Sequence, residues 1–150
     1  MEVKLSLALP RDQMSVPLAR RILKSSLDSL GIDRDTVGDI ELAMTEACTN
    51  VIDHAGGDDD YEVSAGIVGS MCVIEVVDRG AGFDGAQHGL DEVDHHAEEG
   101  RGVLLMRALM DKLEFQSRDA DGTVVRLEKR LSWAADAPIA RLDGEAAAPR

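Results

Sequence analysis

The chain has 150 residues, 44% hydrophobic but only 3% aromatic, which suits one domain with a core of aliphatic side chains. Its formal net charge of -13 argues against direct contact with a nucleic-acid backbone, and the scarcity of aromatic residues argues against a stacking platform for bases. No apolar run reaches the roughly 20 residues that span a bilayer, and the first residues lack a signal-peptide pattern. We therefore expect a cytoplasmic protein without a membrane segment.

The first third of the chain predicts one strand and two helices. Apolar and polar residues alternate over residues 2–9, as in a half-buried strand, and Pro10 ends this pattern. Apolar residues at helical spacing then predict a helix that Ser15 caps and Gly31 ends. A second helix opens within residues 33–36 and continues with an apolar stripe through Ile52.

The middle of the chain predicts a hairpin followed by a loop. Residues 61–68 and 71–78 read as two strands joined by a tight turn, and the second is apolar nearly throughout, so we expect it to lie centrally in the sheet. Acidic residues interrupt residues 83–99 too often for a core element. This stretch is typical of a long mobile loop or lid.

The last elements predict a short buried helix from Gly102 and a closing hairpin of residues 112–118 and 123–131. Beyond Ser132 no periodicity is sustained, which indicates a flexible tail at residues 132–150. The domain then comprises residues 1–131. Strands that are mostly hairpin neighbours, with helices between them, favour an α+β two-layer sandwich.

Glu46 and Asn50 are the first candidate site residues. They stand four residues apart within the second helix, so the carboxylate and the amide project from the same face. Such a pair could hold a metal ion and accept a proton at adjacent points. Considered alone, the pair is more typical of a solvated helix face.

A glycine-rich segment follows the central strand. Asp78 stands at the end of that strand, and Gly80 and Gly82 after it would let a ligand approach the backbone closely. Extended to Gly85, the segment also matches the G-x-G-x-x-G fingerprint of dinucleotide-binding folds. That fingerprint requires an immediate helix, whereas a polar loop follows here, so we do not favour that reading.

Two further segments gain meaning from their order in the chain. Gly100-Arg101-Gly102 opens the last helix, where free backbone N–H groups favour an anion, although a hinge for the preceding loop explains these glycines equally well. Thr123 follows Asp121-Gly122 in what reads as a hairpin turn.

His95 and His96 suggest a solvated loop more than a metal site. The two cysteines, Cys48 and Cys72, read as buried thiols.

In chain order these segments resemble the boxes of the GHKL ATP-binding fold. They are E-x-x-x-N on a helix, D-x-G-x-G after a central strand, an acidic loop, G-x-G opening a helix, and Gly-Thr in a late strand. The stretch from Glu46 to Ala55 and the short lid look most like the anti-sigma-factor serine kinases of the RsbW and SpoIIAB type. The resemblance implies a histidine-kinase-like ATPase sandwich, with helices on one face of a mixed, mostly antiparallel sheet.

The resemblance also implies roles in phosphoryl transfer. Asn50 would bind Mg2+ that bridges the phosphates of ATP, and Glu46 would be the general base that takes the proton of an acceptor serine. Gly100 and Gly102 would meet the phosphates at the end of the lid. Arg101 is a candidate for the γ-phosphate, from its charge and position.

A second set of roles concerns adenine. By the same resemblance, Asp78 would accept a hydrogen bond from the exocyclic amine of the base. Gly80 and Gly82 would let the base approach the backbone, and Thr123 would support the adenine contact.

The function implied is an ATP-dependent serine kinase and anti-sigma factor. Such a protein sequesters a sigma factor and phosphorylates a serine of an anti-anti-sigma protein with a STAS domain. Members of this family are often dimeric, so a homodimer is a further expectation. Two alternatives stay open: an ATP-binding regulator that holds a partner without phosphorylating it, and a detached catalytic domain of a histidine kinase.

Overall fold

The computed structural model describes residues 2–54, 60–78, 97–117 and 123–142. Its elements, in chain order, are β1 (Glu2–Leu9), α1 (Ser15–Leu30), α2 (Arg34–His54), β2 (Tyr61–Val68), β3 (Met71–Asp78), α4 (Ala97–Leu109), β4 (Lys112–Ser117), β5 (Thr123–Arg130) and α5 (Pro138–Leu142). Every strand predicted from the sequence is present. Most of the expected lid lies outside the described residues.

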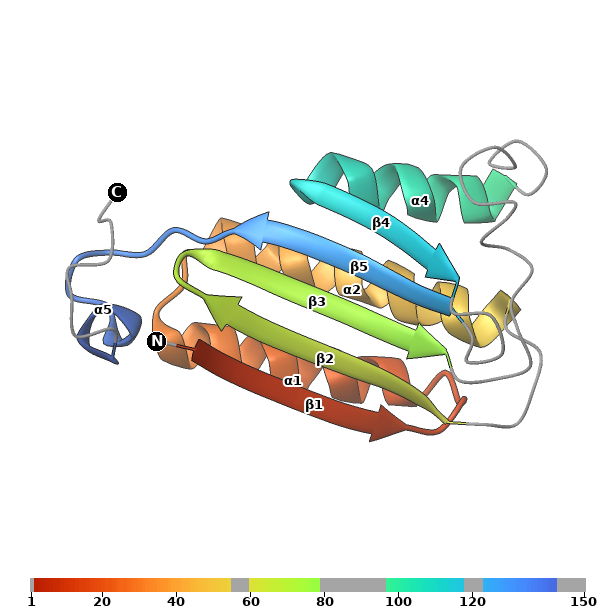
Figure 1. Ribbon diagram of the computed structural model, residues 1–150, viewed down its shortest axis with the longest axis horizontal. Coiled ribbons are helices and arrows are strands. Elements are labelled where there is room, and N and C mark those ends of the chain that lie inside the picture. The colour runs from red at the N-terminus through yellow and green to blue at the C-terminus, as the bar shows by residue number, and fades with distance from the viewer. Residues whose placement is uncertain (1, 55–59, 79–96, 118–122, 143–150) are drawn as a thin grey trace.

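The five strands form one sheet in the order β1-β2-β3-β5-β4 (Figure 1). Each neighbouring pair is antiparallel, so the sheet is antiparallel throughout where a mixed one was expected. Strand β3 lies at the centre, as its apolar sequence predicted. The predicted α+β two-layer sandwich is confirmed.

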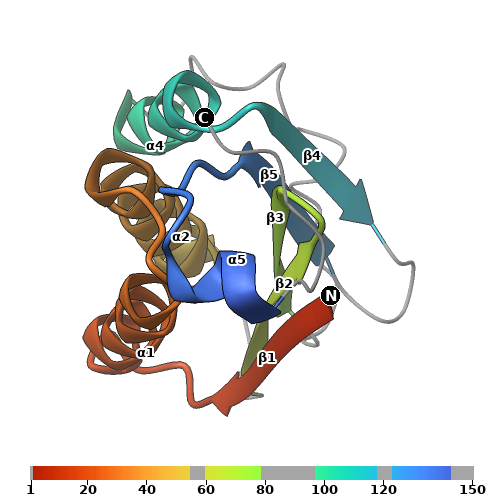
Figure 2. The ribbon, with the colours of Figure 1, turned by 90° about the vertical axis from the view of Figure 1, so that its left-hand side faces the viewer.

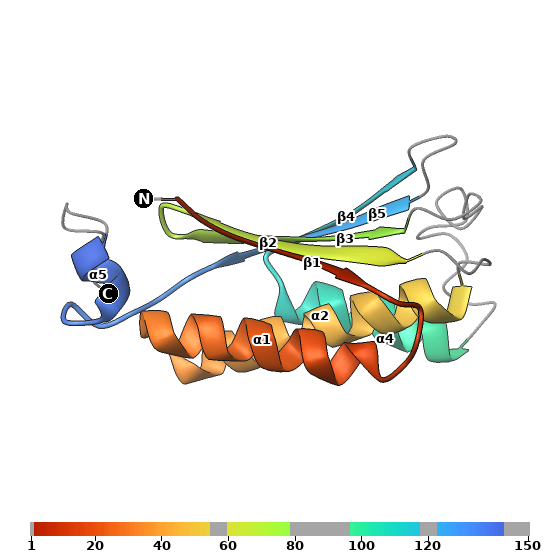
Figure 3. The ribbon, with the colours of Figure 1, turned by 90° about the horizontal axis from the view of Figure 1, so that it is seen from below.

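Helices α1, α2 and α4 form one layer against a single face of the sheet (Figure 2, Figure 3). In β2 and β3 every second residue is buried against this layer, because side chains of a strand alternate between the two faces. Within the described parts of the chain, no helix combines the length and apolarity needed to cross a membrane.

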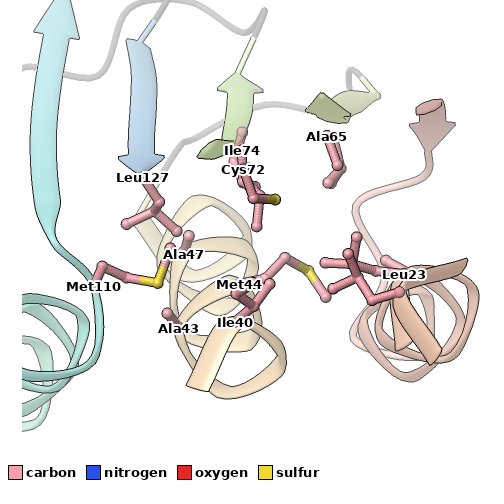
Figure 4. Close-up of a cluster of buried hydrophobic side chains, with 14 of the residues drawn as sticks. Leu23, Ile40, Ala43, Met44, Ala47, Ala65, Cys72, Ile74, Met110 and Leu127 are labelled. Atoms are coloured by element: carbon pink, nitrogen blue, oxygen red, sulfur yellow. The ribbon is translucent and has the colours of Figure 1, made fainter. Parts of the chain in front are cut away.

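Helix α2 carries the centre of the core. Its side chains Ile40, Ala43, Met44 and Ala47 are fully buried, and Figure 4 shows them between the sheet and the flanking helices. The small alanines let the helix approach the sheet closely, while Met44 fills the space toward α1. The packing of α2 therefore fixes which of its residues face away from the core.

Helix α1 ends as predicted but begins differently. Gly31 ends it in the left-handed conformation, with φ 81°. The N-cap position is held by Met14, which makes no side-chain capping bond, so the expected cap at Ser15 is wrong. Ser15 is already helical and buried, and its hydroxyl instead donates to the Asp12 carbonyl at 2.6 Å.

The segment after β5 differs from the flexible tail expected from residue 132. Trp133 is 1% exposed and forms an isolated bridge with Ile32, and Ile139 of α5 is equally buried. Residues 143–150 lie outside the described residues. A sequence pattern cannot reveal this packing, because two separate large side chains are buried without any helical or strand periodicity.

The two ends of the sandwich therefore differ. Helix α5 lies beside one end, near the turn between β2 and β3 (Figure 1). At the opposite end, strand β3 and helix α2 finish, while α4 and β5 begin (Figure 1). All the candidate site residues that the structure describes come from elements meeting at this second end.

Candidate functional site

Helix α2 presents Glu46 and Asn50 one turn apart and half-buried. Their neighbours Ala47, Cys48 and Val51 are buried in the core, which fixes the rotation of the helix. Glu46 and Asn50 therefore share one face of α2, as their spacing predicted. They stand at the edge of the core, where polar side chains can still meet a ligand.

The carboxylate of Glu46 lies against Gly102 of α4. A β-carbon at position 102 would stand 2.9 Å from Oε2 of Glu46, closer than side-chain carbons normally approach. Gly100 and Gly102 are both buried, and α4 packs on α2 along this side. The absence of a side chain at Gly102 thus leaves room for the Glu46 carboxylate.

Helix α4 begins before the glycines, which corrects one expectation. The sequence placed Gly100-Arg101-Gly102 at the free end of the helix, whereas the helix starts at Ala97 and both glycines lie within it. Their backbone N–H groups are therefore not those at the helix terminus. Arg101, between the two buried glycines, is exposed.

Asp78 and Thr123 form the second part of the site. They are directly paired in the ladder between β3 and β5, and both are almost fully buried, at 1% and 2% exposure. Tyr61 of β2 is paired with Asp78 on the other side. A carboxylate in such a place must be compensated by charge or hydrogen bonds.

Arg11 supplies that compensation, and the sequence alone did not reveal it. The residue lies in the connection between β1 and α1, and its guanidinium forms an ion pair with Asp78. The two side chains are 6% and 2% exposed, respectively. Nη1 of Arg11 also donates to the carbonyl of Val51 at 2.9 Å. The only local signal was a cation directly after Pro10, where a solvated side chain is the usual outcome.

A buried polar network lies next to this ion pair. The hydroxyl oxygens of Ser15 and Tyr61 are 2.6 Å apart, and because Ser15 donates to the Asp12 carbonyl, Tyr61 is the donor between them. Burial raises the pKa of Tyr61 to about 12. Burial likewise raises the pKa of Cys48 to about 12, which makes this thiol a poor nucleophile.

The side-chain oxygen of Asn50 suits Mg2+. An amide oxygen is a ligand type that Mg2+ accepts, and this ion commonly takes one or two protein ligands together with water and nucleotide phosphates. Among the residues that the structure describes, no group of three His, Cys, Asp or Glu could hold a metal ion unaided. A metal at Asn50 would therefore depend on ligands from a bound nucleotide. Gly80, Gly82, His95 and His96 fall outside the described residues.

The described site thus has two parts, one on helix α2 and one at the end of the sheet. Glu46 and Asn50 of α2, with Gly102 beside them, offer a proton acceptor and an oxygen ligand. Asp78 and Thr123 offer buried polar groups at the end of the sheet. Arg11 connects the parts, because it binds both Asp78 and the carbonyl that follows Asn50 in α2.

Comparison with known proteins identifies the family to which the chain belongs. Residues 9–129 match the histidine kinase-like ATPase domain. The serine-protein kinase RsbW of Bacillus velezensis is 30% identical over 139 residues, covering 85% of this chain and 86% of that protein. RsbW of Bacillus subtilis is 28% identical over 139 residues with the same coverage.

A solved structure shares the fold. The RsbU and RsbW domains of Rv1364c from Mycobacterium tuberculosis superpose with a TM-score of 0.68 at 22% identity. The match covers 86% of this chain and 32% of the larger one. The chain therefore belongs to the histidine kinase-like ATPase domain family and, within it, to the RsbW group of serine-protein kinases.

Proposed function

We propose that this protein is an ATP-dependent serine kinase that also acts as an anti-sigma factor. It would sequester a sigma factor and phosphorylate a serine of an anti-anti-sigma protein with a STAS domain. The observation that carries the proposal is the position of Glu46, half-buried against Gly102 with Asn50 one turn further along α2. A protein that only bound ATP would have no need for a carboxylate there.

The chemistry assigned to Glu46 is general base catalysis. As the serine hydroxyl attacks the γ-phosphorus of ATP, its proton passes to the Glu46 carboxylate. The new bond joins the serine oxygen to phosphorus, and the bond between the γ-phosphorus and the bridging oxygen breaks to release ADP. Gly102 leaves the space that the carboxylate occupies free of a side chain.

The phosphates are assigned to the same end of the sandwich. Asn50 would hold Mg2+, which supplies positive charge against the charge that develops on the phosphates. Arg101 is exposed between Gly100 and Gly102, so its guanidinium is free to turn toward the γ-phosphate. The two glycines would let the phosphates approach α4 without a side chain in the way.

The adenine is assigned to the end of the sheet. Asp78 would accept a hydrogen bond from the exocyclic amine, and Thr123, its ladder partner, would support this contact. Gly80 and Gly82 would allow the base to approach the backbone. The burial of Asp78 and Thr123 supports this assignment, because hydrogen bonds discriminate best where water is excluded.

The partners follow from the family and from charge. A net charge of -13 favours a basic protein partner, and the DNA-reading parts of a sigma factor are basic. A partner in transcription places the protein in the cytoplasm. A homodimer is part of the proposal through the family resemblance alone.

Phosphorylation of purified candidates tests the proposal. The protein is incubated with labelled Mg·ATP and each candidate anti-anti-sigma protein, as the wild type and as Glu46→Gln. Loss of the base should lower the rate of serine phosphorylation by about 100-fold or more, while ATP still binds. Glu41→Gln is the matched control, since Glu41 lies on the same helix but pairs with Arg20 at 3.6 Å on the surface.

Two results would contradict parts of the proposal. Equal rates of phosphorylation for Glu46→Gln and wild type would show that Glu46 is not the general base. If the wild type binds ATP but labels no candidate, the alternative gains, namely a regulator that binds its partner without phosphorylating it.

A further inference from the structure

We propose that Arg11 is a positioning residue for base recognition, one that holds Asp78 ionised and oriented to accept a hydrogen bond from the exocyclic amine of adenine. This inference rests on the proposed ATP site. It adds a residue from outside the sequence segments that carry the family resemblance, in the connection between β1 and α1. It also assigns to that residue the preference for an adenine nucleotide over one with a carbonyl group at the same position.

The position of Arg11 is fixed from two sides. Its guanidinium pairs with Asp78, and its Nη1 donates to the carbonyl of Val51 at 2.9 Å. Only 6% of the side chain is exposed, so both contacts are shielded from water. A guanidinium suits this position, because its planar set of five N–H donors can serve two acceptors at once.

The guanidinium of Arg11 favours the ionised form of the Asp78 carboxylate beside it. A carboxylate with 1% of its surface exposed is costly to keep ionised unless a cation lies beside it. The structure gives Asp78 such a partner in Arg11. The other neighbours fixed by the sheet, Tyr61 and Thr123, carry neutral hydroxyl groups. Removal of the Arg11 charge therefore favours the protonated acid.

The protonation state of Asp78 determines which base its carboxyl group can bind. An ionised carboxylate only accepts hydrogen bonds, which matches the amine of adenine and repels the carbonyl oxygen that inosine carries at that position. A protonated carboxyl can donate to that carbonyl oxygen. The ratio of the dissociation constants for inosine triphosphate and ATP therefore reports on Asp78, and through it on Arg11.

Arg11 also ties the base-reading end of β3 to helix α2. The carbonyl that it binds belongs to Val51, the residue after Asn50. Loss of Arg11 should thus weaken the link between the end of β3, where adenine is assigned, and the part of α2 where the metal is assigned. A lysine could keep the positive charge, but its single ammonium group cannot reproduce the planar, two-sided contact.

The test compares two nucleotides on three proteins. Dissociation constants of Mg·ATP and of magnesium inosine triphosphate are measured by calorimetry for the wild type, Arg11→Gln and Arg126→Gln. Arg126 of β5 is the matched control. Its Nη1 lies 3.8 Å from Oε1 of Glu75, which is in β3 like Asp78, but the Arg126 side chain is 36% exposed. The wild type and Arg126→Gln should prefer ATP by about tenfold or more, and Arg11→Gln should bring this ratio close to one.

The ratio separates a positioning role from a merely structural one. If Arg11→Gln weakens both nucleotides by the same factor, or leaves the preference for ATP intact, the inference is overturned while the ATP site stands. If the wild type itself does not prefer ATP, the assignment of Asp78 to adenine fails, and the inference fails with it.

Arg11→Lys keeps the test decisive if Arg11→Gln does not fold, which circular dichroism would reveal. Lysine retains the charge, so it should preserve most of the preference for ATP while weakening the binding of both nucleotides. A preference lost in a folded Arg11→Lys protein would overturn the role of charge.

Discussion

At one end of the sandwich polar side chains are buried among the apolar ones, whereas at the other end the buried side chains are apolar. Near the end of β3, the ion pair of Arg11 with Asp78 is buried next to Thr123. Near α5, the space is filled by Trp133, with Ile139 also buried in the core. Burial of apolar side chains stabilises a fold by removing their surface from water. A buried ion pair contributes little net stability compared with apolar side chains of similar volume.

The difference supports placing the proposed site at the end with the buried ion pair. Buried polar groups are expensive, and a hydrophobic replacement is often as stable, so their presence needs another reason than stability. Recognition of a polar ligand is such a reason. Substitutions at the α5 end should therefore change stability and leave chemistry alone, while substitutions at the site end should change chemistry, whatever their effect on stability.

Trp133→Ala should give the largest effect. The loss of a fully buried indole should lower the free energy of unfolding by about 3–5 kcal/mol, as measured by urea denaturation. Trp133→Phe, which keeps most of the apolar surface, should lose far less. Folded Trp133→Ala protein should bind Mg·ATP as the wild type does. A loss under about 1 kcal/mol would show that the indole is not packed as described.

Gly102→Ala should show the reverse pattern. The added methyl group must displace the carboxylate of Glu46, since the two would stand 2.9 Å apart, and the rate of phosphoryl transfer should fall by about 100-fold. Stability should not fall, because alanine favours a helix over glycine. Gly38→Ala is the control, with nothing within 4 Å of its β-carbon, and should stay fully active. Equal rates in the two variants would contradict the contact with Glu46.

Gly31→Ala should lower stability by about 2 kcal/mol. Its backbone has φ +81°, and a β-carbon there would come within 2.8 Å of both Ala137 and Pro138. Gly69→Ala, at φ +60° with open space around it, carries the backbone cost alone and should lose about 1 kcal/mol. Similar losses in thermal unfolding would show that the segment leading into α5 does not press on Gly31.

The smallest predicted effect concerns alkaline pH. Burial raises the pKa of Cys48, near the site, and of Cys72, near the β2–β3 turn, from 9.0 to about 12. The unfolded chain then loses these protons first, so the stability they contribute is complete below pH 9 and declines as the pH rises toward 12. Replacing either thiol with alanine should flatten the fall in unfolding free energy between pH 8 and 10 by about 1 kcal/mol. An unchanged slope in both variants would contradict their burial.

Much of the fold could be predicted because its signals are periodic. The alternation in residues 2–9 and the two apolar runs around Gly69 identify the first three strands, and Gly31 ends a helix for a local steric reason. The start of α4 at Ala97 and the burial of Trp133 could not be predicted. The burial of Trp133 depends on contacts with distant parts of the chain, such as its bridge with Ile32.

The candidate site was predictable in its positions but not in its connections. The spacing of Glu46 and Asn50 suggested a shared helix face, and the structure has them on one. The ladder pairing of Asp78 with Thr123 depends on the strand order, which local patterns do not contain. Arg11 stands 67 positions before Asp78 in the sequence, so only the folded chain reveals the ion pair.

The affinity of Asn50→Ala for ATP tests the central claim most directly, because Asn50 lies one turn from the proposed base Glu46 and directly before Val51, whose carbonyl binds Arg11 beside Asp78. Dissociation constants for ATP are measured by calorimetry with Mg2+ and with a chelator. In the presence of Mg2+, the variant should bind at least about tenfold more weakly than the wild type, and this difference should shrink when the metal is removed. Equal affinities with Mg2+ would contradict the assignment of this end of the sandwich to the nucleotide.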